Sequence, residues 1–90
     1  MNGLSRTLVC AWVLWHSITM GSIGWYVWDG YESLLQCRVV AVEYRRQALT
    51  EPDAEEKGRV IYHTDAKTGQ RYSSRFVCLP SDVDPRKAPQ

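Results

Sequence analysis

The feature that most constrains this chain is an uncharged segment near its N-terminus. From Thr7 to Trp28 the sequence contains no Asp, Glu, Lys or Arg, and Arg6 lies just before it. At about 1.5 Å per residue, a helix over residues 7–28 would be roughly 30 Å long, which is enough to cross a bilayer. We therefore predict a hydrophobic N-terminal helix, and the residues leave three uses for it open.

The first use is a cleaved secretory signal. Arg6 followed by the run LVCAWVLW has the positive-then-apolar layout of a signal peptide, and Ser22-Ile23-Gly24 fits the small-x-small requirement for cleavage. Residues 1–24 would then be removed. The second use is a membrane anchor over residues 7–28, with aromatic side chains near its end at the interface. The third is a buried core helix of a cytoplasmic protein, which the remainder of the chain offers little apolar surface to cover.

The first two uses both export the rest of the chain, because Arg6 would stay inside and the first charges on the other side are acidic. The protein is then periplasmic or secreted, or else anchored in the inner membrane with its domain outside. An oxidising compartment favours disulfides, and Cys37 and Cys78 are the two cysteines beyond the apolar segment. We predict a Cys37–Cys78 disulfide, while Cys10 leaves with the signal or lies in the membrane. Two free buried cysteines are the alternative in a reducing compartment.

The segment after the acidic flank has the pattern of an amphipathic helix. Ser33 and Gln36 form the S-x-x-Q signature of a capping box, and the helix should end near Leu49, before Pro52. One face of this helix would carry Cys37, Val40, Ala41, Tyr44 and Ala48. A strand over residues 37–44 stays open as an alternative, because three valines lower the helix propensity.

Short β-prone runs on either side of the helix complete the predicted fold. Residues 59–64 and 71–78 flank the loop DAKTG, in which Gly69 is placed to adopt a left-handed conformation, so they predict a hairpin. Cys78 would point inward with the aromatic side chains of its strand. Residues 50–58 predict a surface loop, and WYVWDGY a short first strand.

These elements predict one small α+β domain. Its order over residues 25–80 is strand, helix and hairpin (β-α-β-β), after the hydrophobic helix of residues 1–24. The tail over residues 81–90 carries two prolines, directly after Pro80, and mixed charges, so it predicts a disordered end.

Composition and motifs give no support for catalysis. With 90 residues and a net charge of +1 spread over scattered Lys and Arg, the chain predicts neither a large catalytic cleft nor a nucleic-acid surface. His63 has no second histidine or carboxylate at metal-ligand spacing, and Asp82 and Asp84 lack the glycine and distal glutamate of a calcium loop. We predict no catalytic residue, no metal site and no cofactor, and hence a protein that is not an enzyme.

Binding is the remaining class of function. The candidate partner surface comprises residues of the aromatic first strand and of the outward face of the hairpin: Trp25, Tyr26, Trp28, Arg71 and Arg75. We predict a non-enzymatic envelope module that binds an unidentified protein partner. The alternative is a single-pass accessory subunit of a membrane complex, anchored by residues 7–28.

The chain also resembles a loose group of small exported bacterial proteins of unknown function. Those proteins share a signal peptide, an early G-W-Y strand, a C-x-x-A type helix and a late cysteine before D-P-R. The matching residues here are Gly24, Trp25, Tyr26, Cys37, Cys78, Asp84, Pro85 and Arg86. The helix departs slightly from the pattern, because Cys37 is followed by Arg-Val-Val-Ala. The resemblance implies an exported domain with paired cysteines and implies no mechanism.

Overall fold

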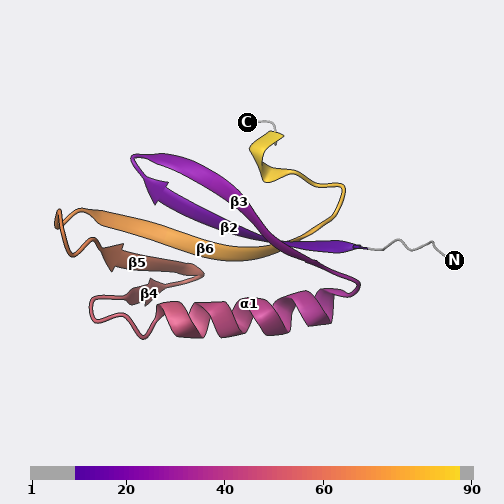
Figure 1. Cartoon of the computed structure of the whole chain (residues 1–90), viewed down its shortest axis with the longest axis horizontal. Coiled ribbons are helices and arrows are strands. Elements are labelled where there is room, and N and C mark those ends of the chain that lie inside the picture. The colour runs from indigo at the N-terminus through magenta and orange to yellow at the C-terminus, as the bar shows by residue number, and fades with distance from the viewer. Residues whose placement is uncertain (1–9, 88–90) are drawn as a thin grey trace, which may run out of the picture.

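Five antiparallel strands and one long helix make up the fold of residues 10–87, the part of the chain that the computed structural model describes (Figure 1). In chain order the elements are β2 (Trp12–Met20), β3 (Ser22–Tyr31), α1 (Leu34–Ala48), β4 (Glu55–Lys57), β5 (Val60–Thr64), β6 (Arg71–Pro80) and the 3-10 helix η1 (Pro85–Lys87). Their order across the sheet is β3-β2-β6-β5-β4. The prediction of one small α+β domain is confirmed, although the domain is mostly sheet and contains more strands than the predicted β-α-β-β order.

The largest correction concerns the uncharged N-terminal segment. Its residues 12–28 form β2 and most of β3 instead of a helix, and Gly21, with φ of 88°, turns the chain between the two strands. The physical reason is that Leu14 and Trp15 point to opposite faces of the sheet and are both buried. A strand that is buried on both faces has a continuous apolar sequence, as a hydrophobic helix does. Residues 1–9, where the predicted helix would begin, lie outside the described residues.

Cleavage after Gly24 and anchoring through residues 7–28 stay predictions. The predicted boundary falls inside β3, so cleavage there would remove β2, which lies between β3 and β6 in the sheet. Between residues 10 and 87, the structure shows no helix with the length and apolar character needed to cross a membrane.

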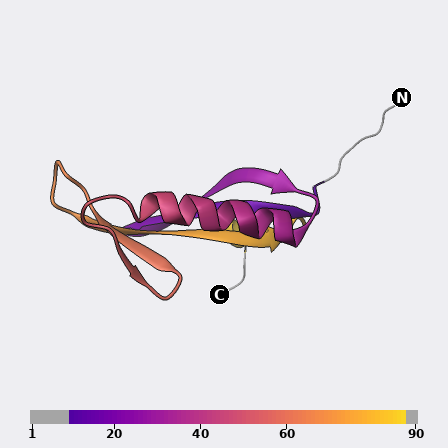
Figure 2. The same ribbon diagram turned by 90° about the horizontal axis from the view of Figure 1, so that it is seen from below.

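The amphipathic helix is confirmed, and the strand alternative for residues 37–44 is wrong. The capping box forms as predicted: the Gln36 amide donates to Ser33 Oγ over 3.1 Å, and the Ser33 amide donates to Gln36 Oε1 over 3.3 Å. Arg45 and Arg46 in the last turn stabilise the negative end of the helix dipole. Figure 2 shows the helix running along β6.

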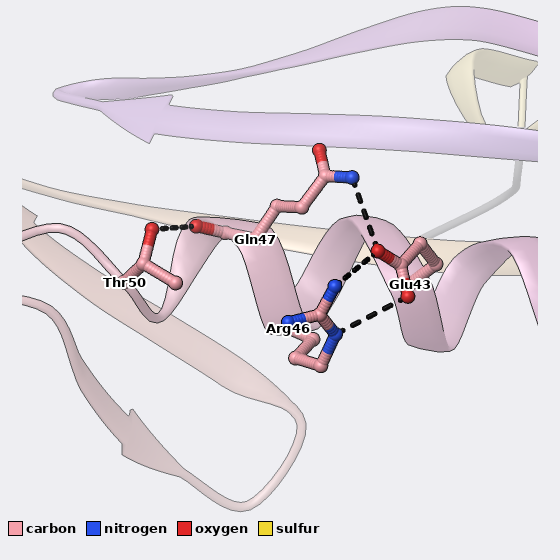
Figure 3. A network of polar contacts seen from close by, with 4 residues as sticks. All are labelled: Glu43, Arg46, Gln47 and Thr50. Carbon is pink, nitrogen blue, oxygen red and sulfur yellow. Dashed lines mark hydrogen bonds and ion pairs between the residues drawn. The ribbon is translucent and has the colours of Figure 1, made fainter.

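A polar network holds the C-terminal half of α1 on its solvent side (Figure 3). The Glu43 carboxylate accepts hydrogen bonds from the Arg46 guanidinium and from Gln47 Nε2. One turn later the Thr50 hydroxyl donates to the Gln47 carbonyl over 2.7 Å, where the helix has ended. These exposed contacts add little stability individually, but they order the last turn and the loop that follows it.

The predicted hairpin is also confirmed, as β5 and β6. The Gly69 amide donates to the Asp65 carbonyl over 2.8 Å, and Gly69 has the expected left-handed backbone, with φ of 72°. The loop prediction for residues 50–58 needs a correction, because Glu55–Lys57 pairs with β5 as the short edge strand β4. The sequence did not indicate this strand, because its side chains are all exposed and it lies in a run of acidic residues.

The predicted disulfide joins α1 to the middle of the sheet. Cys37 and Cys78 are bonded with a Cα–Cα distance of 6.1 Å, and Cys37 is fully buried. Leu14, opposite Cys78 on β2, is fully buried as well. This end of the helix–sheet interface is therefore held together by a covalent bond over a buried apolar side chain, and the disulfide suggests a compartment other than the cytoplasm.

The tail is ordered further than predicted. Instead of being disordered from residue 81, the chain forms η1, and the Arg86 guanidinium lies 5.1 Å from the centre of the Trp15 ring. Arg86 also donates to Asp84 and holds the pKa of that carboxyl down at about 2. Residues 88–90 lie outside the described residues.

Candidate functional site

A groove lies between the C-terminal half of α1 and the sheet. It encloses a cavity of about 370 Å³. Aromatic, aliphatic and polar side chains from α1, the loop after it, β2, β3, β5 and β6 contribute to its lining: His16, Ile18, Trp28, Tyr44, Gln47, Ala48, Glu51, His63, Tyr72, Ser74 and Phe76. Apolar walls around a few convergent polar groups are typical of small-molecule sites.

A β-bulge turns Trp28 into this groove. Leu14 of β2 lies opposite Asp29, whereas the next residue, Trp15, lies opposite Val27, so Trp28 is the extra residue of β3. A bulge re-aims the side chain it carries. The Trp28 ring consequently meets Tyr44 of α1 edge-to-face, with 5.1 Å between the ring centres.

The aromatic wall continues across β2 and β6. The His16 imidazole stacks on Phe76 at 4.5 Å with the two planes 3° apart, and it meets Trp28 edge-to-face at 5.1 Å. Phe76 in turn stacks on Tyr44 at 5.8 Å. Burial lowers the pKa of His16, and the nearby His63 lowers it further, so this environment favours the neutral form of the imidazole.

The polar floor of the groove is a hydrogen-bonded chain of three side chains. His63 Nδ1 lies 2.9 Å from Glu51 Oε1, and His63 Nε2 lies 2.9 Å from Ser74 Oγ. His63 and Ser74 are each only 4% exposed, whereas the Glu51 side chain is 55% exposed at the mouth of the groove. Tyr72 stacks on the His63 ring at 4.9 Å and fixes its plane.

The order carboxylate, imidazole and hydroxyl is that of a nucleophile relay, but the surroundings of Ser74 differ from those of a catalytic serine. Ser74 lies within β6 and is paired on both sides, with Ile18 of β2 and Ile61 of β5. The backbone amides around it are thereby engaged in the sheet, whereas acyl transfer needs free donors aimed at the developing oxyanion. The three hydrogen-bonded side chains are instead suited to accepting a hydrogen bond from a ligand.

The residues of the predicted partner surface lie on two faces of the sheet. Trp28 and Tyr26 are on the side of α1, and Tyr26 is 55% exposed. Trp25 is on the opposite side, where it packs edge-to-face on Trp15 at 6.4 Å. Trp25 and Arg75 flank Ser17 from β3 and β6, in one row of that opposite face.

Arg71 lies apart from these residues and is already engaged. Its guanidinium donates to Thr64 Oγ1 over 3.0 Å and to Glu55 over 3.2 Å. These contacts link β6 to β5 and to the edge strand β4. The structure therefore brings Trp25 and Arg75 together, places Trp28 in the groove, and uses Arg71 within the sheet.

Sequence reasoning missed the partners of His63. Glu51 is 12 residues away and was part of an acidic run interpreted as a solvated connector, while Ser74 is 11 residues away across the hairpin. The one available signal was the hairpin register, which places Ser74 diagonally across from His63 on the same face. Within residues 10–87 no three His, Cys, Asp or Glu side chains are grouped in a way that could hold a metal ion.

Fold and groove together define a small disulfide-bonded α+β domain with a polar-floored cavity. No protein-family model, no curated protein and no solved structure matches the chain. The resemblance to small exported bacterial proteins therefore stays a prediction.

Proposed function

We propose that this protein is an exported, non-enzymatic binding module that pairs with an extended segment of an envelope protein along the free edge of β3. The observation that carries this proposal is the position of β3 in the sheet. It is a ten-residue strand at one end of the strand order, and within residues 10–87 it pairs with β2 alone.

The side chains of β3 fit such a role. Ile23, Tyr26 and Val27 are 54%, 55% and 58% exposed, and Trp28 is 43% exposed. Long edge strands are normally protected by lysine, proline, a β-bulge or a covering element, because their free amides and carbonyls pair with other chains. β3 contains neither Lys nor Pro, and its bulge at Trp28 leaves the pairing of residues 22–27 with β2 regular. Strand addition would satisfy its backbone groups and cover these apolar side chains.

Export is supported by the disulfide. A buried Cys37–Cys78 bond is expected to persist where thiols are oxidised. Intact mass of the protein from its native cells, with and without reductant, tests this: a gain of about two daltons on reduction supports export, and an unchanged mass contradicts it. Carbonate extraction separates a released module from the alternative of a membrane-anchored accessory subunit, which would stay in the pellet.

A crosslinking experiment tests the proposed surface. A photoreactive phenylalanine analogue replaces Tyr26 in the protein made by its native cells, and the matched control carries it at Leu35, an exposed position on α1. We expect a defined crosslinked product from position 26 and none from position 35. Equal crosslinking from both positions, or none from position 26, would contradict binding at β3.

Absence of catalysis is tested at Ser74. A fluorophosphonate probe labels serines that are activated as nucleophiles and can stabilise the resulting adduct. We expect no labelling, because the amides near Ser74 are engaged in the sheet. Labelling that is lost in Ser74→Ala and in His63→Ala, but kept in Ser73→Ala, would show that the protein is an enzyme.

A further inference from the structure

The floor of the groove contains hydrogen-bond acceptors that the fold leaves unused. Because the Glu51 carboxylate can only accept, His63 Nδ1 carries the proton that lies between them. In the neutral ring Nε2 then accepts the Ser74 hydroxyl proton. Both lone pairs of Ser74 Oγ and the second oxygen of Glu51 form no further hydrogen bond within residues 10–87. The floor thus presents acceptors, while its own donors are already used.

The charge of the groove has the sign that suits a cation. Among the lining residues Glu51 is the one Asp or Glu, and none is Lys or Arg. The effect reaches neighbouring groups: the pKa of Tyr72 is raised, first by burial and then by the negative charges of Glu51 and Asp65. An anionic ligand would meet repulsion there, whereas a cation would be attracted.

The rest of the groove is apolar and partly open. Trp28 is 43% exposed, and with Tyr44 and Phe76 it forms a continuous aromatic wall above Ile18. A hydrocarbon or aromatic body would cover this wall, and aromatic faces also attract ammonium groups.

We propose that the groove binds a small organic ammonium ion, with its charged group at the Glu51 carboxylate and its apolar or aromatic body against Trp28, Tyr44 and Phe76. This site is distinct from strand pairing at the β3 edge. It follows from three independent properties of the groove, namely its unused acceptors, its charge and its apolar wall.

Three probes that differ in the polar group test the ligand class. Phenethylammonium, 2-phenylethanol and phenylacetate share an aromatic body and carry a cationic, a neutral and an anionic group. We titrate each into the oxidised full chain and follow the amide resonances by NMR. Phenethylammonium is expected to bind about tenfold more tightly than phenylacetate, because a charge-assisted hydrogen bond replaces a repulsion. The alcohol should lie between them.

Two substitutions assign the polar contacts. Ser74→Ala changes a hydroxyl that the His63 ring separates from Glu51, so it should weaken each probe by less than about twofold. Glu51→Gln removes the charge and should weaken the ammonium more than the alcohol. The matched controls are Ser73→Ala, on the other face of β6, and Glu32→Gln, an exposed acid outside the groove lining. The controls should leave all three affinities unchanged.

The titrations have outcomes that support the proposal and outcomes that contradict it. Ammonium selectivity that is lost in Glu51→Gln and kept in Glu32→Gln supports the proposal. The proposal is wrong if phenylacetate binds as tightly as phenethylammonium, if no probe shifts resonances of groove residues, or if the controls weaken binding as much as Glu51→Gln. Circular dichroism of each variant confirms that it is folded before it is titrated.

Discussion

The two ends of the interface between α1 and the sheet are built in opposite ways. At the N-terminal end, Cys37 is bonded to Cys78 above the fully buried Leu14, so a covalent bond holds the helix on the sheet. At the C-terminal end the same helix borders a groove whose floor is the chain Glu51–His63–Ser74. One end therefore stabilises the fold, and the other has polar groups left over for a ligand. A small domain can maintain an open groove because a covalent bond holds the opposite end.

The most severe way to test this comparison is to remove the strand beneath both ends. Deleting residues 1–24 takes away β2, with its buried Leu14 and Trp15, and we expect complete loss of the folded domain. Amide dispersion in a proton–nitrogen NMR spectrum measures this, and deletion of residues 1–9 is the control. A chain of residues 25–90 that folds and forms the disulfide would instead favour cleavage of residues 1–24 as a signal.

The next largest effect is expected at the disulfide-bonded end. Replacing Cys37 and Cys78 together by Ala should lower the free energy of unfolding by about 4 kcal/mol, because the bond closes a loop with a sequence separation of 41. Urea unfolding measures the change. Cys10→Ser is the control, since Cys10 is exposed and unbonded. Equal stability of the double variant and the parent would show that the disulfide is not what holds this end.

A smaller loss is expected at the open end. His63→Ala removes the hydrogen bonds to Glu51 and Ser74 and leaves a buried hydroxyl without its partner, so stability should fall by about 2 kcal/mol. The same urea experiment, with Ser73→Ala as the control, provides the measurement. If this single substitution cost more than loss of the disulfide, the open end would be the main source of stability and the comparison would be reversed.

The smallest expected effect is a pH dependence of the folding stability that comes from His16, which lies between the two ends of the interface. The pKa of His16 is lowered from 6.5 by burial and by His63, so below pH 6.5 the unfolded state binds a proton more readily than the folded state. The contribution of His16 to stability is thus fully present above pH 6.5 and is lost as the pH falls through its lower folded pKa. His16→Phe, which keeps the stack on Phe76, should unfold in urea with a shallower acid dependence. An identical dependence in both proteins would show that His16 does not contribute.

Local signals in the sequence were sufficient for the elements that depend on near neighbours. The capping box of Ser33 and Gln36 starts α1, and Gly69 closes the hairpin of β5 and β6. The disulfide also followed from local patterns, because Cys37 lies on the inward face of a helix and Cys78 on the inward face of a strand. In each case residues a few positions apart determine the conformation, or a period of 3.6 or 2 determines the direction of a side chain.

Only the tertiary structure decided what the uncharged N-terminal segment became and what the groove contains. An apolar run has the same hydropathy in a membrane helix and in a central strand, and β2 is a strand because β3 and β6 cover its two edges. Trp28 enters the groove through a bulge, and His63 gains Glu51 from beyond the end of α1. Such contacts join residues whose spacing along the chain carries no period, so they exist only once the sheet and the helix have packed together.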